Sequence, residues 1–330
     1  MGHWNGRRVL VTGAGGFIGS HLVEQLAIDG ARVRAFARYN GRNDYGHLES
    51  LPAELRGALD TVAGDVTDPF AVAGAVSGCD DVFHLAALIA IPFSYRAPAS
   101  YVDVNVRGTL NVLEACRRHG IARVVHTSTS ETYGTAIYTP IDEAHPLQAQ
   151  SPYSATKIGG DKLAESYFRS FDLPVVTVRP FNTYGPRQSA RAVIPTVISQ
   201  ALTGDVVRLG SLTPVRDFTF VKDTVAGFMR LGATDAAVGK VFNLANGCGI
   251  TVGELVRRIL ALTGSGATVV ADDERMRPPA SEVLELIGNA TAARAVCGWM
   301  PEISLDDGLR ATIEYVRQHI RTYKPEIYNL

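Results

Sequence analysis

The sequence predicts an α/β protein built on a doubly wound parallel sheet, with a smaller α/β unit in its C-terminal half. Short apolar runs alternate with longer segments of helical periodicity, and a glycine-rich turn follows the first apolar run. This alternation loosens beyond about residue 180. With 330 residues, the chain can bury the cores of one large domain and one smaller domain.

Strands are expected at short apolar runs, namely residues 8–12, 32–37, 59–63, 81–85, 123–127 and 174–178. Helices are expected where apolar residues recur three and four positions apart, at residues 17–29, 101–119, 153–171, 252–263 and 305–320. Right-handed crossovers then place the strands in one parallel sheet. Pro and Gly recur after residue 180, so residues 1–180 are expected to form the sheet domain. Residues 181–330 should form mainly the second domain, interleaved with late elements of the first.

The composition argues against several classes of protein. The net charge is -1, so no general attraction to nucleic acid or to an anionic membrane is expected. No apolar run approaches the length that crosses a bilayer, and the first eight residues include no apolar signal segment. The cysteines are scattered and form no C-x-x-C pair; they are Cys79, Cys116, Cys248 and Cys297. We therefore expect reduced thiols, no metal site and a cytoplasmic protein.

A glycine-rich turn separates the first strand from the first helix. Gly13, Gly16 and Gly19 have the spacing G-x-x-G-x-x-G, a variant of the Rossmann fingerprint. Glycine lets the backbone turn sharply, approach a pyrophosphate and pack the helix closely on the sheet. Free N–H groups at the helix start then face the phosphates. The turn predicts a Rossmann-type dinucleotide-binding domain.

The end of the second strand bears on the choice of dinucleotide. NAD-selective sites usually place Asp or Glu there, whereas this chain has Arg38. Arg38 suits a 2′-phosphate, so NADP is expected. The alternative is NAD, with Arg38 solvated or stacked on adenine. Asp65 ends the third strand and is a candidate to hydrogen-bond the adenine amino group.

Tyr153 and Lys157 are four residues apart on an expected helix, so their side chains share one face. An ammonium beside a phenol should lower the phenol pKa from about 10 toward the working range. Such a tyrosine can take a proton from an alcohol while the carbon gives up a hydride. An ordinary amphipathic helix would show the same spacing. The pair therefore indicates a catalytic site only together with the neighbouring motifs.

A carboxylate with three hydroxyls follows the strand at residues 123–127. Ser128, Thr129 and Ser130 precede Glu131, at the edge of the sheet where α/β folds place ligands. The hydroxyls can bind a substrate alcohol while Glu131 moves a proton at carbon. His126 is expected to be a strand residue at the sheet surface rather than a base.

With these residues in place, the chain resembles the extended short-chain dehydrogenase/reductases that act on nucleotide sugars. Further motifs of that family lie at residues 84–87, 103–109, 179–187 and 216–223. Residues 88–95 and 188–195 resemble the legionaminic-acid-type NDP-N-acetylglucosamine 4,6-dehydratases. Thr129-Ser130-Glu131 replaces the common Thr-Asp-Glu, as in GDP-mannose dehydratases and UDP-glucuronate decarboxylases. A C4-epimerase or a glucuronate decarboxylase therefore stays open, and a non-catalytic Rossmann sensor or scaffold is a remote alternative.

The resemblance implies an NDP-sugar substrate and a mechanism. Tyr153, aided by Thr129, would take the C4 hydroxyl proton, and Glu131 would take the C5 proton. Ser130 or Glu131 would assist water loss from C6, and hydride would return to C6. The cofactor is then regenerated in each turnover, so it should be tightly held.

The resemblance also assigns binding residues. The expected cofactor residues are Gly13, Gly16, Phe17, Ile18, Gly19, Arg38, Asp65, Val66, Leu85, Ala86, Ala87, Asn105, Tyr153 and Lys157. The expected substrate residues are Ser94, Asn182, Arg187, Arg191, Arg216 and Arg277. The arginine fork suits a diphosphate, although Arg191 could equally be a surface charge. A homodimer through the helices at residues 101–119 and 153–171 is also implied.

Overall fold

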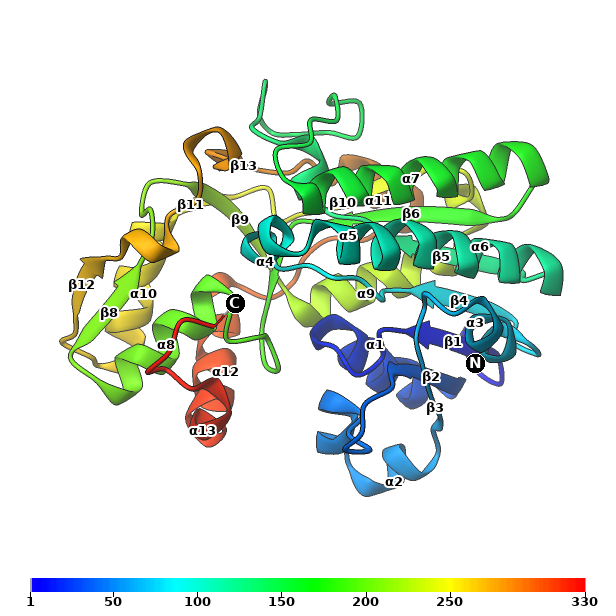
Figure 1. The fold of residues 1–330 in the computed structure, drawn as a ribbon, viewed down its shortest axis with the longest axis horizontal. Coiled ribbons are helices and arrows are strands. Elements are labelled where there is room, and N and C mark those ends of the chain that lie inside the picture. The colour runs from blue at the N-terminus through cyan, green and yellow to red at the C-terminus, as the bar shows by residue number, and fades with distance from the viewer. Residues whose placement is uncertain (1, 330) are drawn as a thin grey trace.

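The computed structural model describes residues 2–329 and confirms the doubly wound α/β fold (Figure 1). In that part of the chain the main sheet has seven strands in the order β10-β6-β5-β4-β1-β2-β3, and all neighbours are parallel. The strands are β1 (Arg8–Thr12), β2 (Arg32–Arg38), β3 (Asp60–Gly64), β4 (Asp81–His84), β5 (Arg123–Thr127), β6 (Val175–Pro180) and β10 (Val241–Leu244). The strand order reverses between β1 and β4, where doubly wound folds bind ligands.

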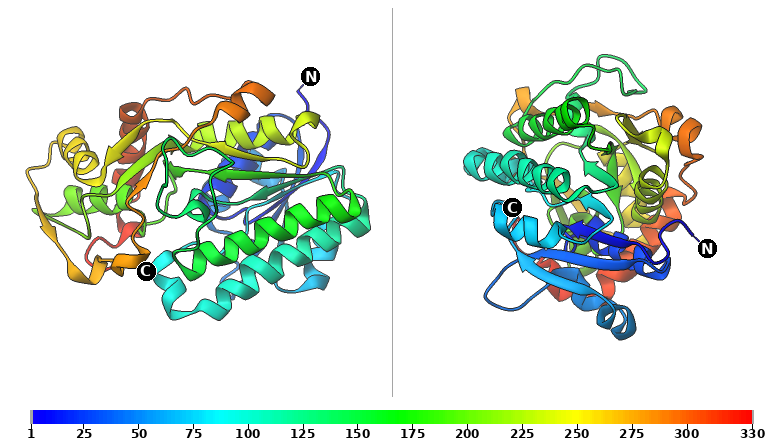
Figure 2. Two further views of the ribbon diagram at one scale, coloured as in Figure 1. Left: turned by 90° about the horizontal axis from the view of Figure 1, so that it is seen from above. Right: turned by 90° about the vertical axis from the view of Figure 1, so that its right-hand side faces the viewer.

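Alternate strand residues contribute to two cores, one on each face of the sheet. Val9 and Val11 of β1 belong to one apolar cluster, and Leu10 between them belongs to the other. The first cluster includes residues of α1 (Phe17–Ile28), α9 (Val221–Gly232) and α11 (Thr291–Cys297). The second includes residues of α3 (Pro69–Val76), α6 (Gly108–His119) and α7 (Pro152–Phe171). Figure 2 shows α6 and α7 side by side along one face.

A second unit lies to the left in Figure 1. One of its sheets contains β7 (Asn182–Tyr184), β9 (Val215–Phe220), β11 (Gly249–Thr251) and β13 (Glu285–Leu286), and a smaller sheet pairs β8 (Val206–Leu209) with β12 (Thr268–Ala271). Its helices are α8 (Val193–Thr203), α10 (Val252–Thr263), α12 (Leu305–Gln318) and α13 (Ile320–Tyr323). Because β10, α9 and α11 return to the main sheet, the two units are interleaved in sequence.

Short helices connect these elements. They are η1 (Gly46–Ser50), α2 (Ala53–Gly57), α4 (Ile91–Arg96), α5 (Pro98–Tyr101), η2 (Val102–Arg107), η3 (Ser130–Tyr133), η4 (Asp235–Ala237), η5 (Asp273–Arg275) and η6 (Pro279–Ser281). Across residues 2–329, no helix combines the length and apolar character needed to cross a bilayer.

The helix expected at residues 101–119 is confirmed, although the π-helical turn η2 forms part of it between α5 and α6. Asn105 lies within this turn and is buried. Its side chain bonds both the N–H and the carbonyl of Leu88, at 2.8 and 2.9 Å. A π-turn is a common device at functional sites, and here it holds the loop that follows β4.

Candidate active site

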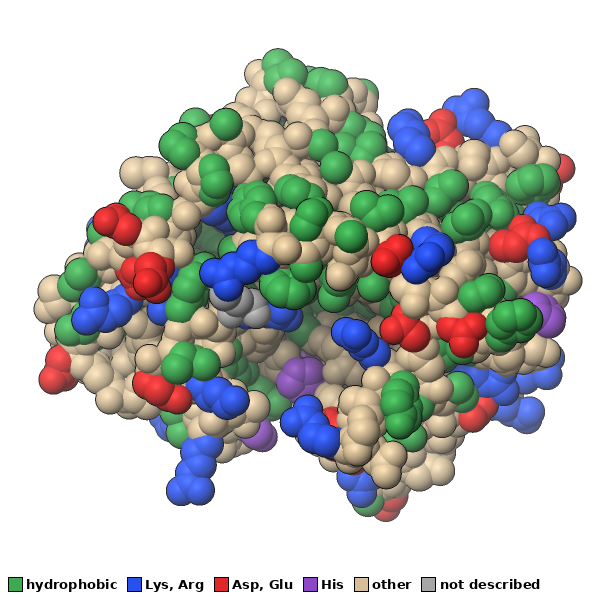
Figure 3. All heavy atoms as spheres, viewed as in Figure 1, with side chains coloured by type: hydrophobic (Ala, Val, Ile, Leu, Met, Phe, Trp, Pro, Cys, Tyr) green, Lys and Arg blue, Asp and Glu red, His purple; other side chains and the backbone are tan. Residues whose placement is uncertain are grey.

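A cavity of about 1030 Å³ opens between the main sheet and the second unit. The glycine-rich turn and the segments after β4 and β5 line it from one side, and loops of the second unit line it from the other. Figure 3 shows the hollow, with Lys and Arg side chains in blue around its rim. The cavity therefore lies at the carboxyl edge of the sheet, where the sequence placed the site.

The glycine turn has the tight geometry that a dinucleotide cradle needs. Gly13 has a φ of +71°, and a Cβ at this position would lie 2.8 Å from the backbone nitrogen of Ala86. A Cβ on Gly19 would lie 2.2 Å from the carbonyl oxygen of Gly13. The helix α1 begins directly after this turn and has no acidic residue in its first turn. A negatively charged pyrophosphate thus fits beside it.

Most of the expected cofactor residues line the cavity. They are Gly13, Gly16, Phe17, Ile18, Gly19, Arg38, Leu85, Ala86, Ala87, Tyr153 and Lys157. Among the described residues, the lining leaves out Asp65, Val66 and Asn105. Asp65 accepts hydrogen bonds from the backbone and hydroxyl of Thr67 and lies 3.9 Å from the Arg38 guanidinium. Asn105 hydrogen-bonds the backbone of Leu88, which lies between the lining residues Ala87 and Ile89.

Tyr153 and Lys157 lie in the first two turns of α7, where Ser151 and Ser154 form a capping box. Both side chains are buried and line the cavity. The Lys157 ammonium donates a 2.6 Å hydrogen bond to the carbonyl of Thr127. The pair therefore shares one helix face and one cavity, as the spacing indicated.

The expected lowering of the Tyr153 phenol pKa is wrong when only the groups of the protein itself act on the phenol. Burial raises the pKa of Tyr153, and the nearby Glu131 carboxylate adds to this rise, although a hydrogen bond with Thr129 opposes it. Burial also lowers the pKa of Lys157 to about 8. The low dielectric of the site therefore outweighs any effect of the ammonium on the phenol.

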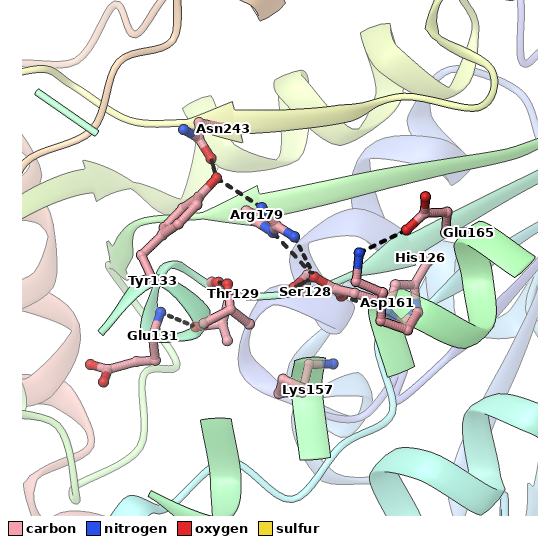
Figure 4. Close-up of polar contacts among 12 residues, drawn as sticks. His126, Ser128, Thr129, Glu131, Tyr133, Lys157, Asp161, Glu165, Arg179 and Asn243 are labelled. Carbon is pink, nitrogen blue, oxygen red and sulfur yellow. Dashed lines mark hydrogen bonds and ion pairs between the residues drawn. The ribbon is translucent and has the colours of Figure 1, made fainter. Parts of the chain in front are cut away.

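The turn at residues 129–133, called the catalytic turn below, carries the carboxylate and hydroxyls into the same cavity. Thr129 caps η3, and its hydroxyl accepts a hydrogen bond from the Glu131 backbone at 3.2 Å. Thr129, Ser130 and Glu131 all line the cavity together with Tyr153. Figure 4 shows Thr129 and Glu131 on this turn, with Lys157 nearby on α7. Ser128 lines the cavity as well, so one cavity holds a phenol, an ammonium, three neighbouring hydroxyls and a carboxylate.

His126 is a strand residue, as expected, but it does not lie at an exposed surface. It is fully buried, and its Nε2 lies 3.2 Å from a carboxylate oxygen of Asp161 on α7. Burial lowers its pKa. It is absent from the described cavity lining, so it is not placed to act as a base on substrate.

Four of the six expected substrate residues line the cavity: Asn182, Arg191, Arg216 and Arg277. The Arg216 and Arg277 guanidiniums lie 3.3 and 3.8 Å from the same Glu282 oxygen. Arg191 donates to the hydroxyl of Ser189 at 3.1 Å. Both guanidiniums therefore lie beside Glu282 at one position in the cavity.

Arg187 and Ser94 lie elsewhere, contrary to expectation. Arg187 has a φ of +68° and forms a 2.8 Å ion pair with Glu24 on α1, so its side chain joins the second unit to the dinucleotide helix. Ser94 is buried, and its hydroxyl donates to the carbonyl of Ile91 within α4. In both cases a nearby protein group engages the side chain, although among the described residues the buried Nη1 of Arg187 has no hydrogen-bond partner.

The cavity also contains residues that the sequence did not single out. They are Gly15, Tyr95, Gln188, Glu282, Tyr328 and Asn329 among others. Gly15 could have been found from its place in the glycine turn, and Gln188 from its place beside Arg187. Tyr328 and Asn329 belong to no sequence motif that would have pointed to them. They line the cavity because residues 324–329 fold back onto it.

The comparison with protein families decides the classification. The family profile described as GDP-mannose 4,6 dehydratase matches residues 10–312 of the chain. The chain belongs to this family. It is an extended short-chain dehydrogenase/reductase of the nucleotide-sugar dehydratase and epimerase group, as the motifs indicated.

Relatives of this family member carry two different activities in their names. This chain is 34% identical over 319 residues to a UDP-glucose 4-epimerase of Mycolicibacterium smegmatis, and the match covers 94% of this chain and 98% of the relative. It is 32% identical over 324 residues to a dTDP-glucose 4,6-dehydratase of Streptomyces griseus, covering 96% of each. The crystal structure of dTDP-glucose 4,6-dehydratase from Streptomyces venezuelae with NAD and TYD bound matches with a TM-score of 0.85 at 29% identity, covering 96% of this chain and 99% of that one.

Proposed function

We propose that the protein is a nucleotide-sugar 4,6-dehydratase that converts an NDP-hexose, namely NDP-N-acetylglucosamine, into its 4-keto-6-deoxy product. The observation that carries this proposal is the position of Glu131 in the cavity that also holds Tyr153. Two acid–base groups in one cavity can serve two neighbouring carbons of a sugar. Arg216 and Arg277 in the same cavity suit the diphosphate.

The chain's own groups carry the proton transfers. Tyr153 takes the proton of the C4 hydroxyl while Thr129 holds that oxygen. Glu131 then removes the proton at C5, which the new C4 ketone has acidified. The C6 hydroxyl leaves as water after accepting a proton from Ser130 or Glu131. When bound, the nicotinamide dinucleotide would take up the C4 hydride and supply it to C6. A proton from an exchangeable acid returns to C5, so the net change is the loss of one water.

For the cofactor, we propose NADP, with NAD as the alternative. Arg38 lines the cavity and has a mostly exposed side chain, which suits a 2′-phosphate. The Asp65 carboxylate 3.9 Å away would reduce this preference by repelling the phosphate. A cytoplasmic homodimer is part of the same proposal, and the exposed side chains of Val102 in η2 and Leu110 in α6 suit a helical interface.

The alternatives are a C4-epimerase and a UDP-glucuronate decarboxylase on the same scaffold. Epimerisation is favoured by the name of one relative at 34% identity. It requires oxidation at C4 and return of hydride to the other face, with no proton removed at C5. Glu131 would then have no chemical task in the cavity, which is why we prefer dehydration.

Product masses test the reaction. The purified protein is incubated with a panel of UDP-, GDP-, CDP- and dTDP-linked hexoses, including N-acetylglucosamine and glucuronate. We expect a product lighter than its substrate by one water, from an N-acetylglucosamine nucleotide. A product of unchanged mass would identify an epimerase, and loss of carbon dioxide from glucuronate would identify a decarboxylase.

A further inference from the structure

A buried carboxylate lies behind the catalytic turn and takes no part in the proposed proton transfers. Asp161 follows Lys157 by one turn of α7, and its side chain is 4% exposed. Among the described residues it is absent from the lining of the catalytic cavity. It lies instead at the centre of the polar contacts drawn in Figure 4.

On one side, Asp161 holds the residue that precedes the catalytic turn. The Ser128 hydroxyl donates to Asp161 Oδ2 at 2.8 Å. Ser128 is directly followed by Thr129, whose hydroxyl caps η3. The start of the catalytic turn is therefore bonded to the helix that carries Tyr153.

On the other side, Arg179 of β6 connects Asp161 to the end of the same turn. Its Nε and Nη2 donate to Asp161 Oδ2 at 3.1 and 2.8 Å, and its Nη1 donates to the Tyr133 hydroxyl at 3.0 Å. Tyr133 ends η3, two residues after Glu131, and its ring lies 4.9 Å from the guanidinium carbon. Its hydroxyl also donates to Asn243 Oδ1 at 2.7 Å.

The pair remains charged at neutral pH. Burial alone would raise the pKa of Asp161, but hydrogen bonds from His126 and Ser128 and the charge on Arg179 lower it to about 2. The planar guanidinium of Arg179 donates hydrogen bonds in fixed directions. The buried ion pair therefore holds Asp161 and Arg179 in one relative geometry.

We propose that Asp161 and Arg179 are a positioning pair that clamps both ends of the catalytic turn, residues 129–133, against α7. This inference rests on the proposed dehydration. Tyr153 must meet C4 while Glu131 meets C5 of one sugar ring, so the separation of turn and helix decides the second step. A displacement of about 1 Å can cost on the order of 100-fold in rate.

The test removes the two hydroxyl ends of the clamp and leaves the ion pair intact. Ser128→Ala combined with Tyr133→Phe deletes one oxygen at each end of the turn. Single-turnover measurements on the protein with bound cofactor follow reduced nicotinamide by absorbance and water loss by product mass. Tyr167→Phe is the matched control, because Tyr167 also lies on α7 and bonds a carboxylate, Glu114, away from the turn.

We expect the double variant to keep C4 hydride transfer within about threefold and to lose about tenfold or more in water loss. Reduced nicotinamide should therefore accumulate, while Tyr167→Phe behaves as wild type. Tyr133→Phe alone should show the same split with a smaller amplitude, and because Ser128 also lines the cavity, this single variant separates positioning from any loss of substrate contact. Equal losses in both steps, or no loss in either, would overturn the proposal. Failure of the dehydratase assignment is separate, since wild type itself would then release no water.

A second observation concerns residues 324–329, which fold back onto the cavity. Lys324 has a φ of +44°, and the Asn329 amide donates to the carbonyls of Tyr323, Lys324 and Ile327 at 3.2 to 3.4 Å. Tyr323 anchors the start of this segment in the main apolar core. These contacts fix the fold of the segment.

The segment places an aromatic ring at the cavity wall. Tyr328 lines the cavity, and the Arg275 guanidinium lies 4.5 Å from the centre of its ring. Arg275 is itself held by a 2.9 Å ion pair with Asp272. Arg277, one of the two arginines that share Glu282, is only two residues away, which is at most about 7 Å of chain.

We propose that Tyr328, backed by Arg275, forms the base-binding end of the nucleotide-sugar site. The proposal builds on the proposed NDP-sugar substrate. With the diphosphate at Arg216 and Arg277, the ribose and base would extend toward Arg275 and Tyr328, which line the same cavity. Aromatic rings and guanidinium planes both favour stacking against a nucleobase.

Binding measurements on the full chain test this without turnover. UDP, GDP, CDP, dTDP and inorganic pyrophosphate are titrated calorimetrically into wild type, Tyr328→Ala and Tyr328→Phe. Tyr328→Ala should weaken the best nucleoside diphosphate by about tenfold and leave pyrophosphate unchanged. Tyr328→Phe should stay within about twofold, because stacking needs the ring and not the hydroxyl.

Tyr138→Ala, an exposed tyrosine outside the described cavity lining, is the control and should change neither ligand. Unchanged binding of nucleoside diphosphates by Tyr328→Ala would refute the subsite. Equal weakening of pyrophosphate would refute it too, by showing a general loss of the site. Neither outcome bears on the reaction type, which product masses decide.

Discussion

The ammonium of Lys157 donates a 2.6 Å hydrogen bond to the backbone carbonyl of Thr127, the last residue of β5. Two residues later, Thr129 begins the turn that carries Glu131. Lys157 therefore fixes the end of the strand against α7 in addition to placing a charge near Tyr153. Burial lowers the pKa of this ammonium to about 8, so its charge is lost within an accessible pH range.

The first prediction is a descending limb in the pH profile with a midpoint near pH 8. The Lys157 ammonium exists below its pKa of about 8 and is lost above it. Removing this charge from beside Tyr153 should disfavour the phenolate, so kcat/KM should fall as the pH rises past this value. Lys157→Arg keeps its charge to about pH 12 and should lack this limb, whatever its absolute rate.

Unfolding is not an explanation for that limb. The pKa of Lys157 is below its ordinary value of 10.5, so between about pH 8 and 10.5 the unfolded chain binds more protons at this residue. This group therefore adds stability as the pH rises through that window. Melting temperatures recorded across the window provide the check. A wild-type profile that is flat from pH 7 to about pH 10 would contradict the role given to Lys157.

The second prediction is that Tyr153→Phe abolishes turnover and preserves cofactor binding. The C4 hydroxyl needs a base, and a positioned acid–base group contributes about a hundredfold or more. The phenyl ring keeps the packing against Tyr101, whose ring centre lies 6.3 Å away. Steady-state rates and cofactor titrations measure the two effects, with Tyr167→Phe as the control. Turnover within about tenfold of wild type would remove Tyr153 from the mechanism.

The third prediction is that Arg38 selects NADP. Arg38→Ala should weaken NADP binding by about tenfold and leave NAD binding almost unchanged, because only NADP has a 2′-phosphate. Titration of both dinucleotides into cofactor-free wild type and variant gives the ratio. Asp65→Asn is a useful partner variant, since removing the carboxylate 3.9 Å from Arg38 should strengthen NADP binding. Equal affinities of wild type for the two dinucleotides would show that Arg38 does not discriminate.

The sequence was sufficient for the main sheet because its strands are short apolar runs bounded by turns. The extent of β6 and the π-turn at residues 102–107 were not predictable in this way. Periodicity cannot distinguish a regular α-helix from one that contains the π-turn η2, and the hydrogen bonds of Asn105 in that turn with Leu88 are tertiary contacts. The interleaving of β10 was expected, although its register beside β6 is a tertiary property.

For the site, the sequence motifs predicted that Glu131, Tyr153 and Lys157 lie together, and all three line one cavity. It could not say which way a polar side chain turns when several partners compete. Arg187 lies beside cavity residues in sequence and still pairs with Glu24, more than 160 residues earlier in the chain. The burial that raises the pKa of Tyr153 is likewise a property of the packed structure.

The fourth prediction concerns Glu131 and separates the candidate reactions by chemistry. Glu131→Gln keeps the shape of the side chain and removes its capacity to take a proton. Oxidation at C4 needs only Tyr153 and the cofactor, so the variant should still form reduced nicotinamide when substrate is added. Removal of the C5 proton should stop, and water loss should fall by about a hundredfold or more.

Deuterated water provides the measurement. Wild-type product should be lighter than its substrate by one water and should carry one solvent deuterium at C5, because the returning proton comes from an exchangeable acid. The Glu131→Gln variant should give almost none of this product. In an epimerase, the same substitution would leave C4 oxidation and return intact, with no deuterium at C5 and no change in mass. That result would overturn the dehydration and would leave the fold and the dinucleotide turn as described.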